Sequence, residues 1–352
     1  RAKYCVGCEL EKTDSDLVNG KCPEHPNREI EIVEEENYFF RFSRYQGELL
    51  SLYREQSQFV VPEKRLNEIV AFVERGLQDF SISRLVSKMP WGIPVPDDEE
   101  HVMYVWFDAL VNYISTIGWN VDQEQFEKFW PGVQIAGKDN LRQQTAMWQA
   151  MLLSAGLAPS KQILIHGHIT CNGQKMSKSL GNVVSPEEMI GKFGKDGARY
   201  LLLSAAVFGE DIDLSWERMT EKYNADLANG LGNLVSRVLK LADRITNQEV
   251  RITEKCVEHM PQEFLRLLEN YRLNDGLEYI WDIVRKSNKY IEDEKPWELA
   301  KTDTEKFETV MKKLLNDLSI IAHLLAPFLP ETSENIRTML AERRGGILFQ
   351  RI

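Results

Sequence analysis

The sequence predicts an α/β domain that begins with a metal-binding knuckle and is followed by an all-helical bundle. Three observations support this fold class. Short apolar runs alternate with helical patterns between about residues 90 and 170, apolar residues after about 185 recur only at helical spacing, and three of the five cysteines lie within the first 22 residues. Buried strands that alternate with helices indicate a parallel sheet. Successive helical stripes indicate a bundle.

Length and charge set broad bounds on function. The chain has 352 residues, which is enough for two or three domains. A net charge of −11 argues against non-specific coating of nucleic acid but allows a local basic face. The sequence has no secretory segment and no apolar run long enough to span a bilayer, so we expect a cytoplasmic protein that does not bind membranes. Because the chain starts at Arg1 rather than at methionine, we expect a fragment or a trimmed product.

The first element is a paired knuckle that predicts a structural zinc site. Cys5-x2-Cys8 and Cys22-x2-His25 are separated by 13 residues. Three thiolates and one imidazole would fill a tetrahedral Zn²⁺ site and leave no position for water or substrate. The paired spacing favours zinc over the alternative, a coincidental group of reduced thiols. Between the two pairs, Asn19-Gly20 predicts a hairpin turn.

The remaining elements follow from hydrophobic periodicity. Residues 38–80 predict two amphipathic helices separated by Pro62. The α/β region is expected to contain, in order, a strand at 102–107, a helix starting within 109–117, a short buried strand at 133–136, a helix at 141–155 and a strand at 162–169. Asn172-Gly173 then turns the chain. Beyond residue 185 we expect helices only, with apolar stripes within 225–245, 277–284 and 314–325.

The turn leads into Lys175-Met176-Ser177-Lys178-Ser179, the most informative stretch of the chain. Two lysines lie three positions apart in a polar loop flanked by Gly173 and Gly181. A lysine ammonium on a flexible stem can follow a charge that moves during a reaction, and cations that meet developing charge lower the barrier. The loop therefore indicates a polyphosphate substrate. The alternative is a solvated surface turn.

Polar residues at predicted strand ends support a nucleotide site. In parallel α/β sheets, ligands bind at the carboxyl ends of strands. The three ends here carry Asp108, 137–139 (Gly-Lys-Asp) and 166–168 (His-Gly-His). Taken with the lysine loop, they predict a nucleoside triphosphate site that lacks a Walker-type loop. His166 and His168 could equally be hydrogen-bonded histidines of the core.

Together these motifs resemble the methionyl-tRNA synthetases, a family of class I aminoacyl-tRNA synthetases. The resemblance runs in order along nearly the whole chain and includes the lysine loop after a His-Gly strand. The other matching segments are residues 36–41, 81–84, 91–94, 104–109, 135–139 and 173–184. The cysteine knuckle corresponds to the zinc insert of the family. The fold implied is a class I Rossmann-type catalytic domain followed by an α-helical anticodon-binding domain.

The resemblance also implies an activity and its residues. The family activates methionine with ATP and Mg²⁺, forms methionyl-adenylate and pyrophosphate, and then esterifies tRNA. The residues implied for the methionine pocket are Phe80, Trp106, Ala109, Tyr113 and Gln144. The residues implied for ATP are Gly137, Asp139, His166, Gly167, Ile169, Lys175, Met176, Ser177, Lys178 and Ser179. Of these, Lys175 and Lys178 are the implied catalytic groups, and Lys178 is expected on the phosphates during adenylate formation.

Three residues of the helical part match the anticodon readers of the family. They are Asn233, Arg237 and Trp297. Asn233 and Arg237 are four positions apart and therefore project from one face of a helix. Trp297 follows Pro296 at a predicted helix start, where it could stack on an unpaired base. The alternative for Trp297 is a tryptophan of the core.

Two departures from the family pattern qualify the resemblance. The His-Ile-Gly-His-type signature is absent, so we expect this chain to hold only the second half of the Rossmann fold and to need a separate N-terminal catalytic segment. Gln144 stands where many relatives have histidine, and a glutamine does not titrate near neutral pH. The parts expected are 1–35 (knuckle), 36–172 (second half of the catalytic domain), 173–222 (lysine loop and stem-contact region) and 223–352 (anticodon bundle).

Three functions are compatible with these features. The first is a methionine–tRNA ligase whose partners are tRNA(Met), methionine and ATP. The second is a non-catalytic tRNA-binding fragment or subunit of a synthetase. The third, a class I synthetase for leucine, isoleucine, valine or cysteine, is disfavoured because Trp106, Ala109 and Tyr113 occur together with a single knuckle.

Overall fold

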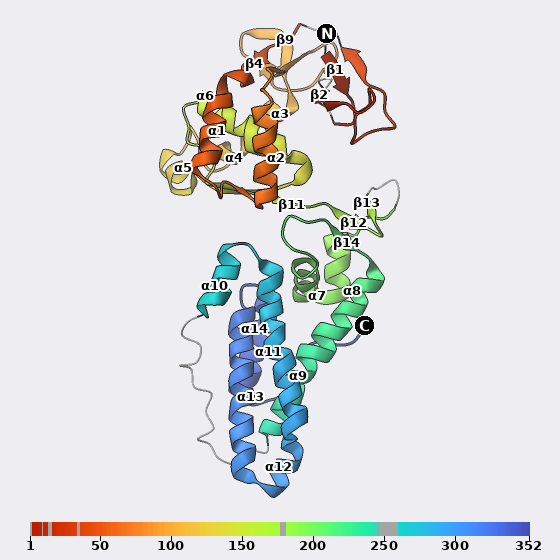
Figure 1. The fold of residues 1–352 in the computed structure, drawn as a ribbon, viewed down its shortest axis with the longest axis vertical. Helices are drawn as coiled ribbons and strands as arrows, with labels where there is room; N and C mark the ends of the chain where they lie inside the picture. The colour runs from red at the N-terminus through yellow and green to blue at the C-terminus, as the bar shows by residue number, and fades with distance from the viewer. Residues whose placement is uncertain are drawn as a thin grey trace. The chain divides into compact units, whose positions relative to one another are not determined.

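The protein is described by a computed structural model of residues 1–352 (Figure 1). The structure describes all of them except residues 1, 9, 13–15, 34–35, 177–180, 244 and 246–259. Contacts divide the chain into two compact units, Arg1–Ile165 and His166–Ile352. Each unit is described by itself below.

The first unit begins with a small antiparallel sheet that carries the knuckle. Its strands are β1 (Ala2–Cys5), β2 (Leu10–Lys12) and β3 (Glu31–Val33), in the order β2-β1-β3. Between β2 and β3, Val18 and Lys21 exchange two backbone hydrogen bonds of 2.9 and 3.1 Å. Asn19 and Gly20 have φ values of 52° and 75°, as a two-residue hairpin turn requires. The turn predicted from Asn19-Gly20 is confirmed.

Two helices and a parallel strand pair form the main core of this unit. Helices α1 (Gln46–Glu55) and α2 (Glu63–Glu74) are the two predicted amphipathic helices, and they pack against each other (Figure 1). Strands β5 (Val60–Val61), β10 (Val133–Gly137) and β11 (Gln162–His166) form a sheet in the order β10-β11-β5. Strand β11 is parallel to β5. The predicted parallel α/β arrangement is therefore confirmed.

A second antiparallel sheet corrects the expected strand at 102–107. Strand β9 (Asp98–Met103) lies between β7 (Ser83–Leu85) and β8 (Pro94–Val95), while β4 (Phe39–Phe40) pairs with β6 (Phe80–Ser81). The β9 strand ends because the chain turns at Tyr104, whose carbonyl accepts the N–H groups of Phe107 and Asp108. Residues 105–109 are therefore helical (α3, Val105–Ala109), and the expected strand was wrong over its second half.

The remaining elements of the unit surround β10. They are α4 (Asn112–Ser115), α5 (Gln123–Phe129), a 3-10 turn (Lys138–Asn140), a π-helix η4 (Gln143–Met147) and α6 (Trp148–Ser154). The helix predicted at 141–155 is thus present, but its first part is wound as a π-helix. Strand β10 was expected to be buried throughout. It is instead half exposed, since Val133 and Ile135 are 45% and 64% exposed on the outer strand of the sheet.

The second unit opens with a three-stranded sheet. Strands β12 (Ile169–Cys171), β13 (Gln174–Lys175) and β14 (Ile212–Leu214) lie in the order β13-β12-β14. The β12–β13 pair is an antiparallel hairpin, and β14 is parallel to β12. The expectation that only helices follow residue 185 was wrong at β14. That strand is too short for periodicity to detect, and its partner is distant in sequence.

Helices make up the rest of the second unit. Helix α7 (Pro186–Leu203) starts at a capping box between Ser185 and Glu188, bends at Gly194, and is followed by α8 (Trp216–Lys222), the π-helix η6 (Tyr223–Gly232) and α9 (Asn233–Ala242). The bundle continues with α10 (Gln262–Glu269), α11 (Leu273–Glu294), α12 (Pro296–Thr302), α13 (Thr304–Leu325) and α14 (Pro330–Glu342).

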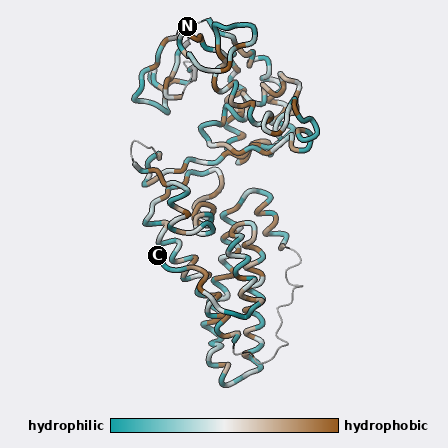
Figure 2. The backbone as a smooth tube through the Cα atoms, turned by 180° about the vertical axis from the view of Figure 1, so that it is seen from behind, coloured by the Kyte–Doolittle hydropathy of each residue, from teal (hydrophilic) through white to brown (hydrophobic). Residues whose placement is uncertain are grey.

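The predicted apolar stripes of the bundle are its core. Leu277, Ile280, Trp281 and Val284 are buried on α11, and the stripe from Leu314 to Leu325 is buried on α13. Apolar and polar segments alternate along these helices in Figure 2. Across the described ranges, no helix is both long enough and apolar enough to cross a bilayer.

Contacts of two arginines help to join the knuckle to the rest of the first unit. The guanidinium of Arg84 lies 5.7 Å from the ring centre of Tyr4 on β1 and 4.4 Å from that of Tyr104. Arg142 forms an ion pair of 2.9 Å with Asp16. Cation–π contacts and a partly exposed ion pair each contribute modestly, so the knuckle is held by several weak contacts.

A buried histidine ties the segment after the knuckle to β9. His101 lies 2.9 Å through Nδ1 from Asp98 Oδ2 and 2.8 Å through Nε2 from the carbonyl oxygen of Glu36. Both partners are acceptors, so only the doubly protonated imidazolium can donate to both. The carbonyl of Glu36, followed by the carboxylates of Asp98 and Glu100, raises the pKa of His101. Tyr38 also faces this group and donates to Asp98.

This geometry predicts a stability that falls as pH rises. The pKa of His101 is higher in the folded state than its unfolded value of about 6.5. His101 therefore contributes fully to the free energy of unfolding below about pH 6.5, and this contribution is lost as pH rises through the folded-state pKa. We expect the urea midpoint of the wild type to fall between about pH 6 and pH 8.5 by more than that of His101→Gln. Urea titrations at both pH values, followed by circular dichroism, measure this. Equal shifts in the two proteins would contradict it.

Candidate functional site

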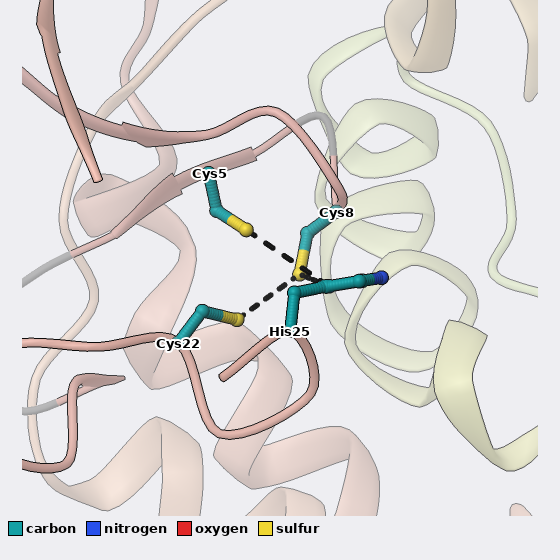
Figure 3. A group of neighbouring side chains, drawn as sticks. All are labelled: Cys5, Cys8, Cys22 and His25. Carbon is teal, nitrogen blue, oxygen red and sulfur yellow. Dashed lines mark hydrogen bonds between the residues drawn. The ribbon is translucent and has the colours of Figure 1, made fainter. Parts of the chain in front are cut away.

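Four side chains from two tight turns converge in the first unit (Figure 3). Cys5 ends β1 and Cys8 follows in the next turn, while Cys22 and His25 come from the turn after the Asn19-Gly20 hairpin. The four potential ligand atoms all lie within 4.8 Å of one another. The Sγ of Cys8 lies 3.4 Å from the Sγ of Cys22 and 3.2 Å from Nδ1 of His25. The structure thus brings together all four residues of the predicted zinc site.

The donor set fits a four-coordinate metal ion. Tetrahedral coordination with metal–sulfur bonds of about 2.3 Å separates the sulfurs by about 3.8 Å, close to the distances found here. Burial, followed by the neighbouring thiol of Cys22, raises the pKa of Cys8 to about 12. A thiolate at this position therefore needs a cation at neutral pH. The arrangement can bind a metal, and four protein ligands leave no open position for chemistry.

The residues assigned by resemblance to the amino-acid pocket all lie in the first unit. Trp106 and Ala109 are on α3 and Tyr113 is on α4, at helical spacing. Phe80 on β6 has its ring centre 5.5 Å from those of Phe40 and Phe42. Gln144 is buried in the π-helix η4.

Gln144 and Tyr113 are joined directly. The Nε2 of Gln144 donates to the hydroxyl of Tyr113 at 3.0 Å. The Oε1 of Gln144 and the Nε1 of Trp106 are buried and have no hydrogen-bond partner among the described residues. Buried polar atoms are nearly always paired, so unpaired ones need an explanation. One acceptor and one donor are therefore available in this part of the unit to a bound polar molecule.

The residues implied for ATP are divided between the two units. Gly137 ends β10, and Asp139 is exposed in the 3-10 turn that follows it; both belong to the first unit. The residues that belong to the second unit are His166, Gly167, Ile169, Lys175 and Met176. Ser177, Lys178 and Ser179 lie outside the described residues.

Gly167 lies where the backbone can carry no side chain. A Cβ built at this position would lie 2.2 Å from the carbonyl oxygen of Glu210. On either side, the N–H of His168 donates to Asp211 Oδ1 at 2.9 Å, and Nδ1 of His166 lies 2.7 Å from the Gly167 oxygen. The glycine thus permits a close backbone approach that precedes the β12–β14 pairing. Ile169, the first residue of β12, is 39% exposed.

The lysine loop starts on a hairpin that a carboxylate holds. Asn172 and Gly173 form its turn, with φ values of 53° and 71°. Asp213 on β14 accepts the Gly173 N–H at 2.6 Å and the hydroxyl of Thr170 at 2.9 Å. The hydrogen bond from the Gly173 N–H, followed by that from Thr170, lowers the pKa of Asp213. Lys175 is exposed on β13.

Sequence reasoning had missed Asp213. In the sequence, Asp213 lies between Ile212 and Leu214 in a short alternating segment. This pattern does not indicate that its partner lies about forty residues earlier in the chain. Met176, the next residue of the loop, is half-buried and packs against the hydrophobic core of the second unit. The hairpin is therefore anchored at both ends, through its turn and through Met176.

The three residues matched to anticodon readers occupy one surface of the bundle. Asn233 is exposed at the start of α9, and Arg237 lies one turn further along. The Arg237 guanidinium lies 5.8 Å from the ring centre of Trp297 and forms an ion pair of 2.7 Å with Glu292. Trp297 is half-buried at the start of α12. The sequence had not identified Glu292, which lies near the end of α11.

A cavity opens beside Asn233. It has a volume of about 530 Å³ and lies between one face of η6 and α9 and the C-terminal segment 346–351. Asn233 and Ser236 form part of its polar wall, and Ile347 and Phe349 part of its apolar wall. Its size falls within the range of small-molecule sites.

Comparisons with known proteins show the family of the chain. Residues 1–239 match the family described as tRNA synthetases class I (M), and residues 240–346 match the anticodon binding domain of methionyl tRNA ligase. The methionine–tRNA ligases of Synechocystis sp. and Caldanaerobacter subterraneus are 41% and 39% identical to this chain, over 96% and 99% of it. The chain spans 66% and 60% of the length of these two relatives.

Solved structures are similar as well. Methionyl-tRNA synthetase from Mycobacterium tuberculosis, in complex with methionyl-adenylate, aligns with a TM-score of 0.82 and 35% sequence identity. The alignment covers 96% of this chain and 70% of that chain. Because 96% of the chain is covered, the likeness extends over both units.

The knuckle geometry predicts that Gly7→Ala abolishes metal binding. A Cβ at Gly7 would lie 2.5 Å from Cγ of His25, so the imidazole must leave its position. We expect metal content, measured by mass spectrometry of the native protein, to fall from about one ion per chain to near zero. Gly47→Ala, where a Cβ meets no atom within 4 Å, serves as the control. Full metal content in Gly7→Ala would contradict the assignment.

Proposed function

This chain belongs to the methionine-type class I tRNA synthetases, and from that premise we propose that it is a methionine–tRNA ligase. It activates methionine with ATP to methionyl-adenylate, releases pyrophosphate, and esterifies tRNA(Met), in the cytoplasm. The observation that carries the proposal is the pair of adjoining family matches, which join a catalytic sequence to an anticodon-binding sequence in one chain. The division into parts 1–35, 36–172, 173–222 and 223–352 is retained in this proposal.

The methionine pocket is assigned to Phe80, Trp106, Ala109, Tyr113 and Gln144. Aromatic walls suit a polarizable thioether, which makes favourable contacts with aromatic rings. The hydrogen bond from Gln144 to Tyr113 supports this assignment because it uses an acceptor site of the phenol oxygen and leaves the phenol proton available.

ATP is assigned to the strand-end and lysine-loop residues. Asp139 is exposed after β10 and suits a ribose hydroxyl. The backbone at Gly167 and Ile169 suits an adenine edge. Lys175 and Lys178 are the catalytic cations that neutralise the phosphates as pyrophosphate leaves, in company with the Mg²⁺ of the MgATP substrate. Their lysine stems can follow that charge.

Zn²⁺ is assigned to Cys5, Cys8, Cys22 and His25. Three thiolates and one imidazole are the ligand set of structural zinc sites. When bound, the ion would cross-link the two turns, which is a structural role and not a catalytic one. The four residues hold together the two turns of the knuckle, whose Tyr4 and Asp16 contact Arg84 and Arg142 of the rest of the unit.

The tRNA anticodon is assigned to the surface of Asn233, Arg237 and Trp297. A stacking ring, a guanidinium and a carboxamide are the groups that read unpaired bases. The cavity beside Asn233 supports the assignment because it offers polar and apolar walls next to a base-reading amide. Arg237 already lies over Trp297, so the ring is oriented before RNA binds.

The catalytic part of this proposal predicts the effect of Lys178→Ala. Methionine-dependent ATP–pyrophosphate exchange should fall by orders of magnitude while the dissociation constant for methionine stays nearly unchanged, because the lysine acts on charge that develops in the transition state. Lys161→Ala, at an exposed lysine outside the loop, is the control. The assays use the residue 1–352 chain and the polypeptide at its natural length. No exchange in either, with RNA still bound, would overturn the ligase proposal and leave a tRNA-binding protein.

The RNA-binding part predicts the effect of Trp297→Ala. Loss of a stacking ring should weaken binding of a hairpin RNA that carries the methionine anticodon by about 1–3 kcal/mol, or about 5- to 150-fold. Trp297→Phe keeps an aromatic face and should retain most of the affinity. Fluorescence anisotropy of the labelled hairpin measures both, with a hairpin of altered loop sequence as the control RNA. Unchanged affinity in a folded Trp297→Ala protein would show that this tryptophan only packs the core.

A further inference from the structure

A chain of buried amide and hydroxyl groups crosses the interior of the first unit. Gln149 on α6 donates through Nε2 to the carbonyl oxygen of Gln144 at 2.9 Å and to Ser160 Oγ at 3.1 Å. The N–H of Ser160 donates to Gln149 Oε1 at 2.9 Å, and Ser160 Oγ donates to Gln134 Oε1 at 2.6 Å. All four residues are at most 5% exposed.

Two backbone groups determine how the Gln149 amide is oriented in this chain of hydrogen bonds. The N–H of Ser160 can only donate, and the carbonyl of Gln144 can only accept. The Gln149 amide therefore cannot be flipped, because Oε1 must face Ser160 N and Nε2 must face the Gln144 oxygen. Since Gln149 donates to Ser160 Oγ, the hydroxyl proton of Ser160 remains available to donate to Oε1 of Gln134. The two bonds of the Gln149 amide to backbone groups have fixed directions.

This network acts at an unusual turn of helix. Residues 143–147 are wound as a π-helix, a geometry that is frequent at functional sites. The Gln149 side chain binds the carbonyl of Gln144 in this stretch. The side chain of Gln144 in turn donates to Tyr113. The backbone of Gln144 is held from one side, and its amide reaches Tyr113 on the other.

We propose that Gln149, Ser160 and Gln134 form a positioning relay that fixes Gln144 against Tyr113 and thereby sets selectivity for the substrate side chain. The inference rests on the proposed function, since Tyr113 and Gln144 are its methionine-pocket residues. The relay residues are not among those assigned to the methionine pocket, so their proposed role is to position Gln144. Gln144 presents a donor to the phenol oxygen, so the phenol proton is left to point at an acceptor such as a thioether sulfur. An aliphatic side chain of the same size offers no acceptor.

The relay also makes this selection independent of pH. All its groups are neutral amides and a hydroxyl, and none titrates near neutrality. A histidine at position 144 would change both charge and donor number in the physiological range. We therefore expect the KM for methionine to be flat between about pH 6 and 8 in the wild type and to vary with pH in Gln144→His.

The relay is tested by removing its central amide. Gln149→Met keeps length and volume but cannot donate to Gln144, and we expect the KM for methionine in pyrophosphate exchange to rise about tenfold while kcat changes little. Ser160→Ala keeps both backbone-directed bonds of Gln149 and should raise KM by a smaller factor, about two- to threefold. Norleucine has the shape of methionine but lacks the sulfur. The preference of the protein for methionine over norleucine should fall more in Gln149→Met than in Ser160→Ala.

The control is Tyr53→Phe. The Tyr53 hydroxyl donates to the carbonyl of Thr145 at 2.7 Å, so this variant also loses one buried bond to the π-helix, but one that is not linked to the side chain of Gln144. Its melting temperature should fall and its KM should not change. Equal KM changes in Tyr53→Phe and Gln149→Met, or none in Gln149→Met and Ser160→Ala, would overturn the relay.

A double-variant cycle and an activity-free measurement complete the test. Because the relay acts through Gln144, Gln149→Met should add nothing to KM in a Gln144→Met background; full additivity would overturn it. The Nε2–H resonance of Gln144, observed by NMR with labelled glutamine, should shift in Gln149→Met and not in Tyr53→Phe. If the wild-type polypeptide at its natural length neither binds nor activates methionine, the proposed function is wrong, and the resonance still decides whether Gln149 positions Gln144.

Discussion

The pairing of β12 with β14 determines how the second unit carries its lysine hairpin. Three consecutive pairs align the strands, from Ile169 with Ile212 to Cys171 with Leu214. The close approach of Gly167 to the carbonyl of Glu210 permits this register, and Asp213 then reaches the turn of the hairpin. A carboxylate that accepts two hydrogen bonds holds a turn better than an apolar residue can. The hairpin is consequently built on the same unit as the helical bundle.

The first unit depends on a different kind of constraint, which is the polarity of buried hydrogen bonds. A buried donor or acceptor without a partner costs more than a made bond gains. In the relay around Gln149, a backbone carbonyl and a backbone N–H fix the orientation of the buried amide. Such a network specifies geometry more than it adds stability. It therefore suits the support proposed for Gln144, which has to hold one orientation.

The features that could be predicted from the sequence are local ones. Asn19-Gly20 and Asn172-Gly173 form hairpin turns because their left-handed conformations are encoded by two adjacent residues. The metal knuckle was found because ligand spacing is a short-range pattern. The stripes on α11 and α13 were found because a helix repeats its own period.

The features that could not be predicted depend on partners distant in the chain. Strand β14 exists only by pairing with β12, some forty residues earlier. The expected strand at 102–107 stops at Met103 because Tyr104 starts a helix. Gln149 and Ser160 are adjacent to each other only in the fold, and no periodicity marks either. The ion pair of Arg237 with Glu292 joins α9 to α11, and a charge pattern within one helix cannot reveal it.

The two proposed binding surfaces differ in how their polar groups are prepared for a ligand. Gln144 is 4% exposed and its backbone is held by a buried bond, which suits the proposed recognition of a small side chain without rearrangement. The side chain of Arg237 is 28% exposed, and that of its partner Glu292 is 61% exposed. An ion pair so exposed contributes only about 0–1 kcal/mol. The guanidinium can therefore exchange the carboxylate for a nucleic-acid group at little cost, while Trp297 remains in place beneath it. Rigid polar groups suit the small substrate, and exchangeable ones suit the large, mobile RNA.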